Sequence, residues 1–306
     1  MTRFALLRLV QSLVSLFAIT VIVFGLSHAT GSPIDTMLPD DATTEQIAAL
    51  SRNLGLDEPL WRQYLVFLGN ALQGDFGMSL KWRGQSAMGV VLDRLPATLR
   101  LGGLALLISI AVAIPAGVVS AVRRGTWADH LVRGFALFGQ SIPAFWLGIV
   151  LIWIFAVGLG WLPTSGHGGL AHMILPAISI AAFQIAALTR LTRSAMLEVL
   201  DTEYVKLARI KGASETAVVW RHAFANAAIV PLTYFGVLAG SVLTGSIVVE
   251  TVFGWPGAGW LAIEAIRARD FPVIQAVVMF FALAFLLANV LVDLLYAWVD
   301  PRVRHG

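Results

Sequence analysis

The sequence predicts an all-α, polytopic membrane protein with six transmembrane helices. Hydrophobic residues make up 58% of its 306 residues and charged residues only 13%, which is about half the charged fraction of a soluble domain. The mean hydropathy is +0.81. Five long stretches also contain no Asp, Glu, Lys or Arg, namely 9–34, 101–122, 134–189, 222–249 and 271–292. A helix needs about 20 apolar residues to cross a hydrocarbon core of about 30 Å.

Six spans follow from these stretches. Four of them suit one helix each, and 134–189 suits two because the segment Gly158–Gly169 interrupts it. We place the helices near 9–28, 98–122, 134–157, 173–195, 227–250 and 273–297. Proline removes a helical hydrogen bond, so Pro115, Pro143 and Pro176 are expected to kink the second, third and fourth spans.

The first apolar stretch has two interpretations. Arg3 and Arg8 precede it and small residues follow near Ala29, as in a signal peptide. Signal peptides have apolar regions of about 7–15 residues, and Leu9–Ser27 is longer. We therefore favour a retained first helix.

Basic residues set the expected orientation. With a cytoplasmic N-terminus, 13 of the 21 Lys and Arg residues lie in inner segments, and the two short outer loops hold only Arg267 and Arg269. This bias follows the positive-inside rule, so both termini are expected in the cytoplasm. The chain then divides into a cytoplasmic N-terminus with the first helix (1–28), an extracytoplasmic segment (29–97) and a five-helix core (98–306).

The outer segment contains a predicted amphipathic helix. In "LWRQYLVFLGNALQ", one helical face carries Trp61, Tyr64, Leu65, Leu68 and Leu72. Such a helix suits the membrane surface or the outer mouth of a path, and a small packed subdomain is an equal alternative.

Composition and motifs exclude several functions. The chain has no cysteine and a net charge of only +3, so thiolate chemistry and nucleic-acid binding are not expected. It lacks the GxxxxGK[ST] pattern of a phosphate-binding loop. His167 and His172 share an outer loop but have no acidic or cysteine partners nearby, so we expect no metal site, and no catalytic residue is proposed.

The segment Asp201–Ser214, "DTEYVKLARIKGAS", is unusually charged for its apolar surroundings. Leu197, Leu200, Tyr204 and Leu207 fall on one helical stripe. Lys206, Arg209 and Lys211 lie where cations suit a helix C-terminus, Gly212 suits a left-handed end, and Ser214 can cap a second helix. A helix, a glycine elbow and a second helix are predicted, and an amphipathic loop lying on lipid headgroups is the alternative.

This segment resembles the cytoplasmic EAA loop of membrane subunits of ATP-binding-cassette (ABC) importers. Against the general pattern only Ala208 and Gly212 match. The peptide and nickel branch is more similar, through Tyr204, Ala208, Arg209, Lys211, Gly212 and then Arg221-His222-Ala223. The stretches "LGLDEPLWRQY", "GDFGMSL", "VETVFGWPGAGWL" and "RDFPVIQAVV" to "NVLVDLLYAWVDPRVR" also resemble that branch.

The resemblance implies a type I ABC importer permease in the bacterial inner membrane, with a coupling loop near 196–226 and no enzyme activity of its own. It also implies a second homologous permease subunit, expected to form a heterodimer, two cytoplasmic ATPases that bind ATP and Mg²⁺, and an extracytoplasmic solute-binding protein. The chain itself would contact lipid and bind no cofactor. The branch carries dipeptides, oligopeptides, glutathione or nickel chelates.

Three residues are candidates for the path or its gate. Gly236 and Gly240 form a small-residue face, for which packing within the subunit is the alternative. Glu250 near the outer end of the fifth span could meet a cationic solute or a partner's arginine, or be paired structurally. An ion-coupled secondary transporter is the competing function, although midplane carboxylates typical of proton coupling are not evident. No nucleophile–base pair supports an intramembrane enzyme.

Overall fold

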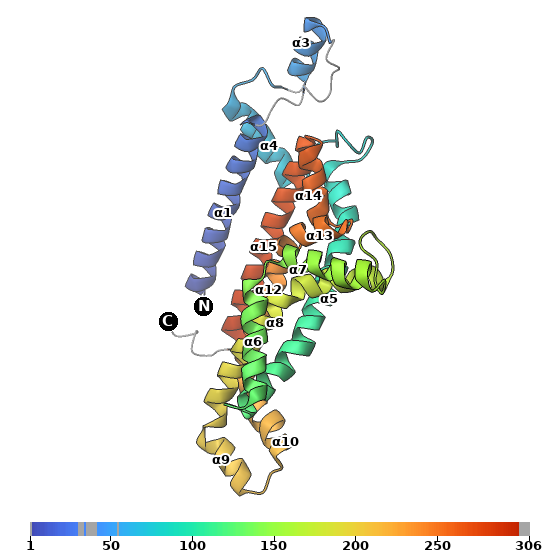
Figure 1. Ribbon diagram of the computed structural model, residues 1–306. Helices are drawn as coiled ribbons and strands as arrows, with labels where there is room; N and C mark the ends of the chain where they lie inside the picture. Colours follow the sequence, from blue (N-terminus) through green and yellow to red (C-terminus); the bar gives the residue numbers. More distant parts are fainter. Residues whose placement is uncertain (1, 30–33, 35–41, 54, 300–306) are drawn as a thin grey trace. The chain divides into compact units, whose positions relative to one another are not determined.

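The computed structural model describes residues 2–29, 34, 42–53 and 55–299. These residues form helices and one isolated antiparallel bridge between Met78 and Ser86, with no strand among them. The predicted all-α class is therefore confirmed. The chain packs as two units, Met1–Thr98 with Pro256–Leu286 and Leu99–Trp255 with Leu287–Gly306, and Figure 1 labels their helices.

The first unit contains the N-terminal helices and the first part of the chain's last helix. Its elements are α1 (Thr2–Ala29), α3 (Thr44–Asn53), α4 (Leu60–Leu72), the start of α5 (Ala87–Val122), α14 (Ala258–Arg267) and the start of α15 (Phe271–Val299).

Helix α4 begins after Pro59, as the sequence predicts, and packs on α1. Tyr64 Oη lies 2.7 Å from Thr20 Oγ1, and its ring meets Phe24 edge-on at 5.4 Å. Trp61 and Leu72, predicted on the same face as Tyr64, are exposed. The predicted stripe is thus divided between contact with α1 and the free surface.

A buried carboxylate fixes the loop before α5. Asp270 Oδ2 accepts hydrogen bonds from Ser79 Oγ at 2.5 Å and from the amides of Leu80 and Lys81 at 3.0 Å. Lys81 Nζ in turn pairs with Glu264 of α14 at 2.6 Å. These bonds join the loop containing Ser79 and Lys81 to the segment containing Glu264 and Asp270, nearly 200 residues later in the sequence. Together they form what we call the cap around Asp270.

The second unit is built around α8 (Leu170–Leu200), which packs against α6, α7 and α12. Its other elements are the end of α5, α6 (Trp127–Ser141), α7 (Ala144–Leu151), the π-helix η1 (Ile152–Gly158), α9 (Glu203–Ile210), α10 (Glu215–Ala217), the π-helix η2 (Val218–Phe224), α11 (Ala225–Ala227), α12 (Ile229–Gly245), α13 (Ile247–Phe253) and the end of α15. Two glycines permit close contact with α8. A Cβ on Gly117 of α5 would lie 2.6 Å from Thr192, and one on Gly139 of α6 would lie 3.0 Å from the Ala182 carbonyl.

The third predicted span, 134–157, is not one continuous helix, because it is broken at Pro143, where the sequence analysis expected a kink. Helices α6 and α7 meet at a bend of 106°. Ile142, before Pro143, has an extended backbone with ψ of 124°, as proline imposes on its predecessor. Pro176, by contrast, lies inside a continuous α8.

The count of six spans is not confirmed. Within the described residues, four helices are long and apolar enough to cross a membrane, or five if the bent pair counts as one span. The predicted fifth span, 227–250, is divided at Ser246 into α12 and α13, and only Ile229–Leu238 ranks as a shorter apolar helix.

Candidate functional site

The segment between α8 and η2 forms two short helices joined by a glycine elbow. Helix α8 ends at Leu200, and α9 runs from Glu203 to Ile210. Gly212 then takes φ of +82°. This left-handed conformation costs an L-residue energy but suits glycine. Ser214 caps the next helix, since its Oγ accepts a hydrogen bond from the Ala217 amide at 3.4 Å.

The inner face of this coupling loop is fixed to the chain's own core. Val205 and Ala208 of α9 are buried in one cluster with Met196 of α8 and Val218 of η2. Val118 and Ala121, at the end of α5, belong to the same cluster. Figure 1 shows α9 and α10 together beyond the end of α8. Helix α9 therefore packs directly on the ends of α5 and α8.

The outer face of α9 is apolar and exposed. Tyr204, Leu207 and Ile210 expose 44%, 49% and 81% of their surfaces. The predicted stripe joined Tyr204 and Leu207 to Leu197 and Leu200, but α8 ends before Thr202 and the two pairs separate. Leu197 and Leu200 pack on the buried cluster, whereas Tyr204 and Leu207 face outward.

Ion pairs border this exposed face. Lys206 Nζ lies 2.8 Å from Glu203 Oε1, and Arg209 Nε lies 2.9 Å from Glu215 Oε1 across the elbow. The hydrogen bond to Glu203 raises the pKa of Lys206 above its usual value, with the charge of Glu203 adding to the effect. Lys211 is the helix's C-terminal cap and is exposed.

A buried carboxylate near the same end was missed by the sequence analysis. Asp129 of α6 accepts hydrogen bonds from Ser120 Oγ at 2.6 Å and the Gly125 amide at 3.0 Å. Arg193 of α8 donates to both of its oxygens, at 2.9 and 3.1 Å, and Arg133 Nε lies 3.4 Å away. A lone acidic residue at the start of an apolar helix was the available signal.

The candidate path residues have different surroundings. A Cβ on Gly240 would lie 2.9 Å from that of Ala288, so α12 and α15 approach closely there. Gly236 is partly buried. Glu250 of α13 is fully buried, and its Oε1 accepts a hydrogen bond from Ser246 Oγ at 3.0 Å.

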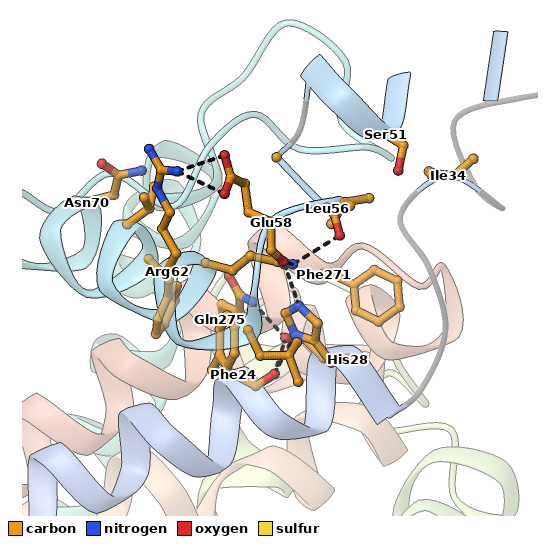
Figure 2. Close-up of a pocket in the computed structure, with 16 residues that line it drawn as sticks. Phe24, His28, Ile34, Ser51, Leu56, Glu58, Arg62, Asn70, Phe271 and Gln275 are labelled. Atoms are coloured by element: carbon orange, nitrogen blue, oxygen red, sulfur yellow. Dashed lines mark hydrogen bonds and ion pairs between the residues drawn. The ribbon is translucent and has the colours of Figure 1, made fainter. Parts of the chain in front are cut away.

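A cavity of about 680 Å³ lies in the first unit between α1, α4 and the start of α15. Its polar side chains bond to one another. Arg62 pairs with both oxygens of Glu58, as Figure 2 shows, and Gln63 Oε1 lies 3.0 Å from His28 Nε2. Gln275 donates to Ser27 Oγ.

The two histidines that the sequence analysis placed in one loop have different surroundings. His167 packs against the buried Trp255 ring at 5.2 Å, and His172 is separate at the start of α8. No group of three His, Cys, Asp or Glu ligands is present among the described residues.

Comparison of the sequence with known protein families identifies the family to which this chain belongs. Residues 113–305 match the model described as "Binding-protein-dependent transport system inner membrane component", and residues 1–102 match its N-terminal companion. The chain belongs to this family. It is therefore a permease subunit of an ABC importer, as the coupling-loop resemblance implied.

Relatives of the permease extend over its full length. It is 40% identical to the glutathione transport system permease protein GsiC of Escherichia coli strain K12 over 306 residues, covering all of both chains. It is 36% identical to the dipeptide transport system permease protein DppB of Alkalihalophilus pseudofirmus, again covering both chains. Among solved structures, one described as an amino acid ABC transporter with histidines shares the fold, with a TM-score of 0.54 at 15% identity over 67% of this chain and 92% of that one.

Membership of this family indicates where the permease is located and which classes of subunit it works with. It is a multi-pass inner membrane protein, and the family implies ATPase subunits, a binding protein and a second permease as partners. Nothing in the comparisons supports the ion-coupled alternative.

Proposed function

We propose that this permease forms half of a translocation path for small peptide-like solutes. Its full-length relatives are named for glutathione and dipeptide transport. The other half of the path comes from a homologous permease in a heterodimer, and an extracytoplasmic binding protein delivers the solute. Two separate ATPases bind the ATP and Mg²⁺, because this sequence has no phosphate-binding loop of its own. The permease subunit itself catalyses no reaction.

The orientation that fits this role has both termini in the cytoplasm. The positive-inside distribution of Lys and Arg supports it. The 203–215 loop then faces the ATPases, and the cap around Asp270 faces the binding protein.

One observation carries the coupling assignment: α9 is apolar on two faces. Val205 and Ala208 anchor it to α5 and α8, while Tyr204, Leu207 and Ile210 remain exposed. A short helix with such a face suits a groove on a soluble partner. Closure of the ATPases would then move α9 as a rigid body and bias the spans between two arrangements.

The loop residues have separate roles in this proposal. Tyr204 belongs to the docking face, and Lys206, Arg209 and Lys211 form its polar border. Ala208 packs the helix inward, Gly212 sets the angle and Ser214 starts the second helix. In the path, Gly240 provides close packing with α15, Gly236 continues the same helix face, and the buried Glu250 holds α13 near the outer end.

Reconstitution tests the proposal directly. Proteoliposomes containing both permeases and both ATPases should take up labelled glutathione or a labelled dipeptide when the binding protein and ATP are supplied. Omitting either the ATPases or the binding protein should abolish uptake. Accumulation by this chain alone under an imposed proton or sodium gradient would contradict the assignment.

A further inference from the structure

A cavity of about 290 Å³ lies between α6 and α8 in the second unit. The two helices are in close contact at Gly139 and Ala186 and are joined again by the Asp129–Arg193 pair. The cavity occupies the gap between these contacts. Arg193 is seven residues from the end of α8, so the cavity lies about 10 Å along the helix from the coupling loop.

The cavity carries an excess of positive charge. Arg133, Arg190 and Arg193 all line it. Asp129 accepts from Arg193 and lies beside Arg133, so three guanidinium charges face one carboxylate and about two positive charges remain. Within the described part of the chain, the partner of Arg190 is a neutral group, Gln140 Oε1 at 2.7 Å. His130 Nδ1, 2.8 Å from Arg133, accepts from it and adds no negative charge.

A buried hydroxyl also lines the cavity without a partner. Thr189 exposes only 3% of its surface, and its Oγ1 makes no hydrogen bond within the described part of the chain. Buried hydroxyls are nearly always bonded, and leaving one unbonded costs about 1–3 kcal/mol. This donor, next to the guanidinium groups, is suited to an acceptor that comes from outside the chain.

The border of the cavity is apolar. Leu137 of α6 lines it and is 68% exposed, and Phe138 beside it is equally exposed. The cavity therefore has a positively charged interior and an apolar border. That combination matches a phospholipid, whose phosphate lies at the level of the headgroups and whose chains run along apolar side chains.

We propose that this cavity binds the phosphate group of an anionic phospholipid. A phosphate offers several acceptor oxygens, which can receive bonds from Arg190, Arg193 and Thr189 together. Assignment to the cytoplasmic leaflet rests on the orientation proposed above, but the binding itself does not. The bound lipid would contact both α6 and α8 and so stabilise their packing near the coupling loop. Free inorganic phosphate offers the same chemistry and must be distinguished.

Native mass spectrometry of the delipidated, full-length permease in complex with its partner subunits measures the binding. Phosphatidylglycerol is the probe, and zwitterionic phosphatidylcholine is its matched control. The variants are Arg190→Gln and Thr189→Val. Arg124→Gln is the control variant, because it removes an exposed charge that does not line the cavity.

We expect phosphatidylglycerol to bind more tightly than phosphatidylcholine. Arg190→Gln should weaken it about fivefold, since one arginine near a lipid headgroup contributes about that factor. Thr189→Val should weaken it by a similar factor while leaving the lipid-free unfolding temperature unchanged or higher, because the lost hydroxyl has no protein partner. Arg124→Gln should stay within about twofold of the wild type.

Equal lipid binding by the wild type and both cavity variants would overturn the proposal. A thermal shift with inorganic phosphate, without binding of phosphatidylglycerol, would overturn the lipid assignment and identify the soluble ion. Loss of the second permease from the Arg190→Gln complex, with lipid binding unchanged, would assign the cavity to a carboxylate of that partner. None of these measurements depends on transport, so they stand apart from the test of the proposed function.

Discussion

Gly212 offers a graded test of the elbow in the coupling loop. Its φ is +82°, and a Cβ built there would meet no atom within 4 Å. Substitution is therefore penalised by backbone conformation and not by a clash. The left-handed region costs an L-residue about 1–2 kcal/mol, it is more tolerant of Asn, and a β-branched residue is a genuine outlier there. The cost should rise from Gly212→Asn to Gly212→Ala to Gly212→Val.

A penalty of this size lowers the equilibrium constant for the native elbow by about five- to thirtyfold. Retention of the ATPase by the purified permease, and ATP-dependent uptake, should fall in the same order. Membrane abundance should stay at the wild-type level because the spans are unchanged. Gly69→Ala is the matched control: it also has free space around it but lies inside α4, where alanine is favoured over glycine. Undiminished ATPase retention and uptake in Gly212→Val would refute this reasoning.

Three further predictions follow from buried or paired groups. Ala208→Trp should loosen the loop from its own core, because Ala208 is buried there; limited proteolysis should cut the loop faster, and unchanged cutting would place the residue outward. Asp129→Asn should destabilise the second unit by about 3–5 kcal/mol, because the Arg193 guanidinium then has no carboxylate to compensate its charge. A thermal unfolding midpoint equal to that of the wild type would contradict this. The Lys81 hydrogen bond lowers the pKa of Glu264 in the cap around Asp270. The stabilisation from this pair is therefore present above the ordinary pKa of a glutamate and disappears as pH falls through the lowered value. Lys81→Met should reduce this acid dependence in hydrogen exchange of α14, and an identical pH profile would count against the pair.

The sequence identified the helices well where apolar length alone decides them. Helices α1, α8 and α15 include the predicted spans, because each contains a largely apolar stretch of about 20 residues without Asp, Glu, Lys or Arg. The third span failed because apolar composition does not show whether a proline kinks a helix or ends it. Pro143 redirects the chain by 106°, while Pro176 remains inside α8.

The coupling loop shows the same limit at the level of side chains. Its helix, elbow and cap follow from local residue preferences, and Gly212 and Ser214 have the expected conformations. Which side chains of α9 face inward and which face outward did not follow from the sequence. The break between α8 and α9 at Thr202 ends the continuous helical spacing on which the predicted stripe depended. Asp129 and Thr189 were not singled out, since their roles depend on the packing of α6 against α8, and local sequence patterns do not show which helices pack together.

Site-specific cross-linking tests the central claim, that the outer face of α9 docks on an ATPase. The chain has no cysteine, so a single one can carry a photoreactive benzophenone without background. Ile210 of α9 and Leu72 of α4 are both aliphatic and both 81% exposed, which makes Leu72→Cys a matched control. In the assembled complex in membranes, labelled Ile210→Cys should cross-link to the ATPase on illumination and labelled Leu72→Cys should not. Absence of the ATPase adduct at Ile210, or an equal yield at both positions, would contradict the account.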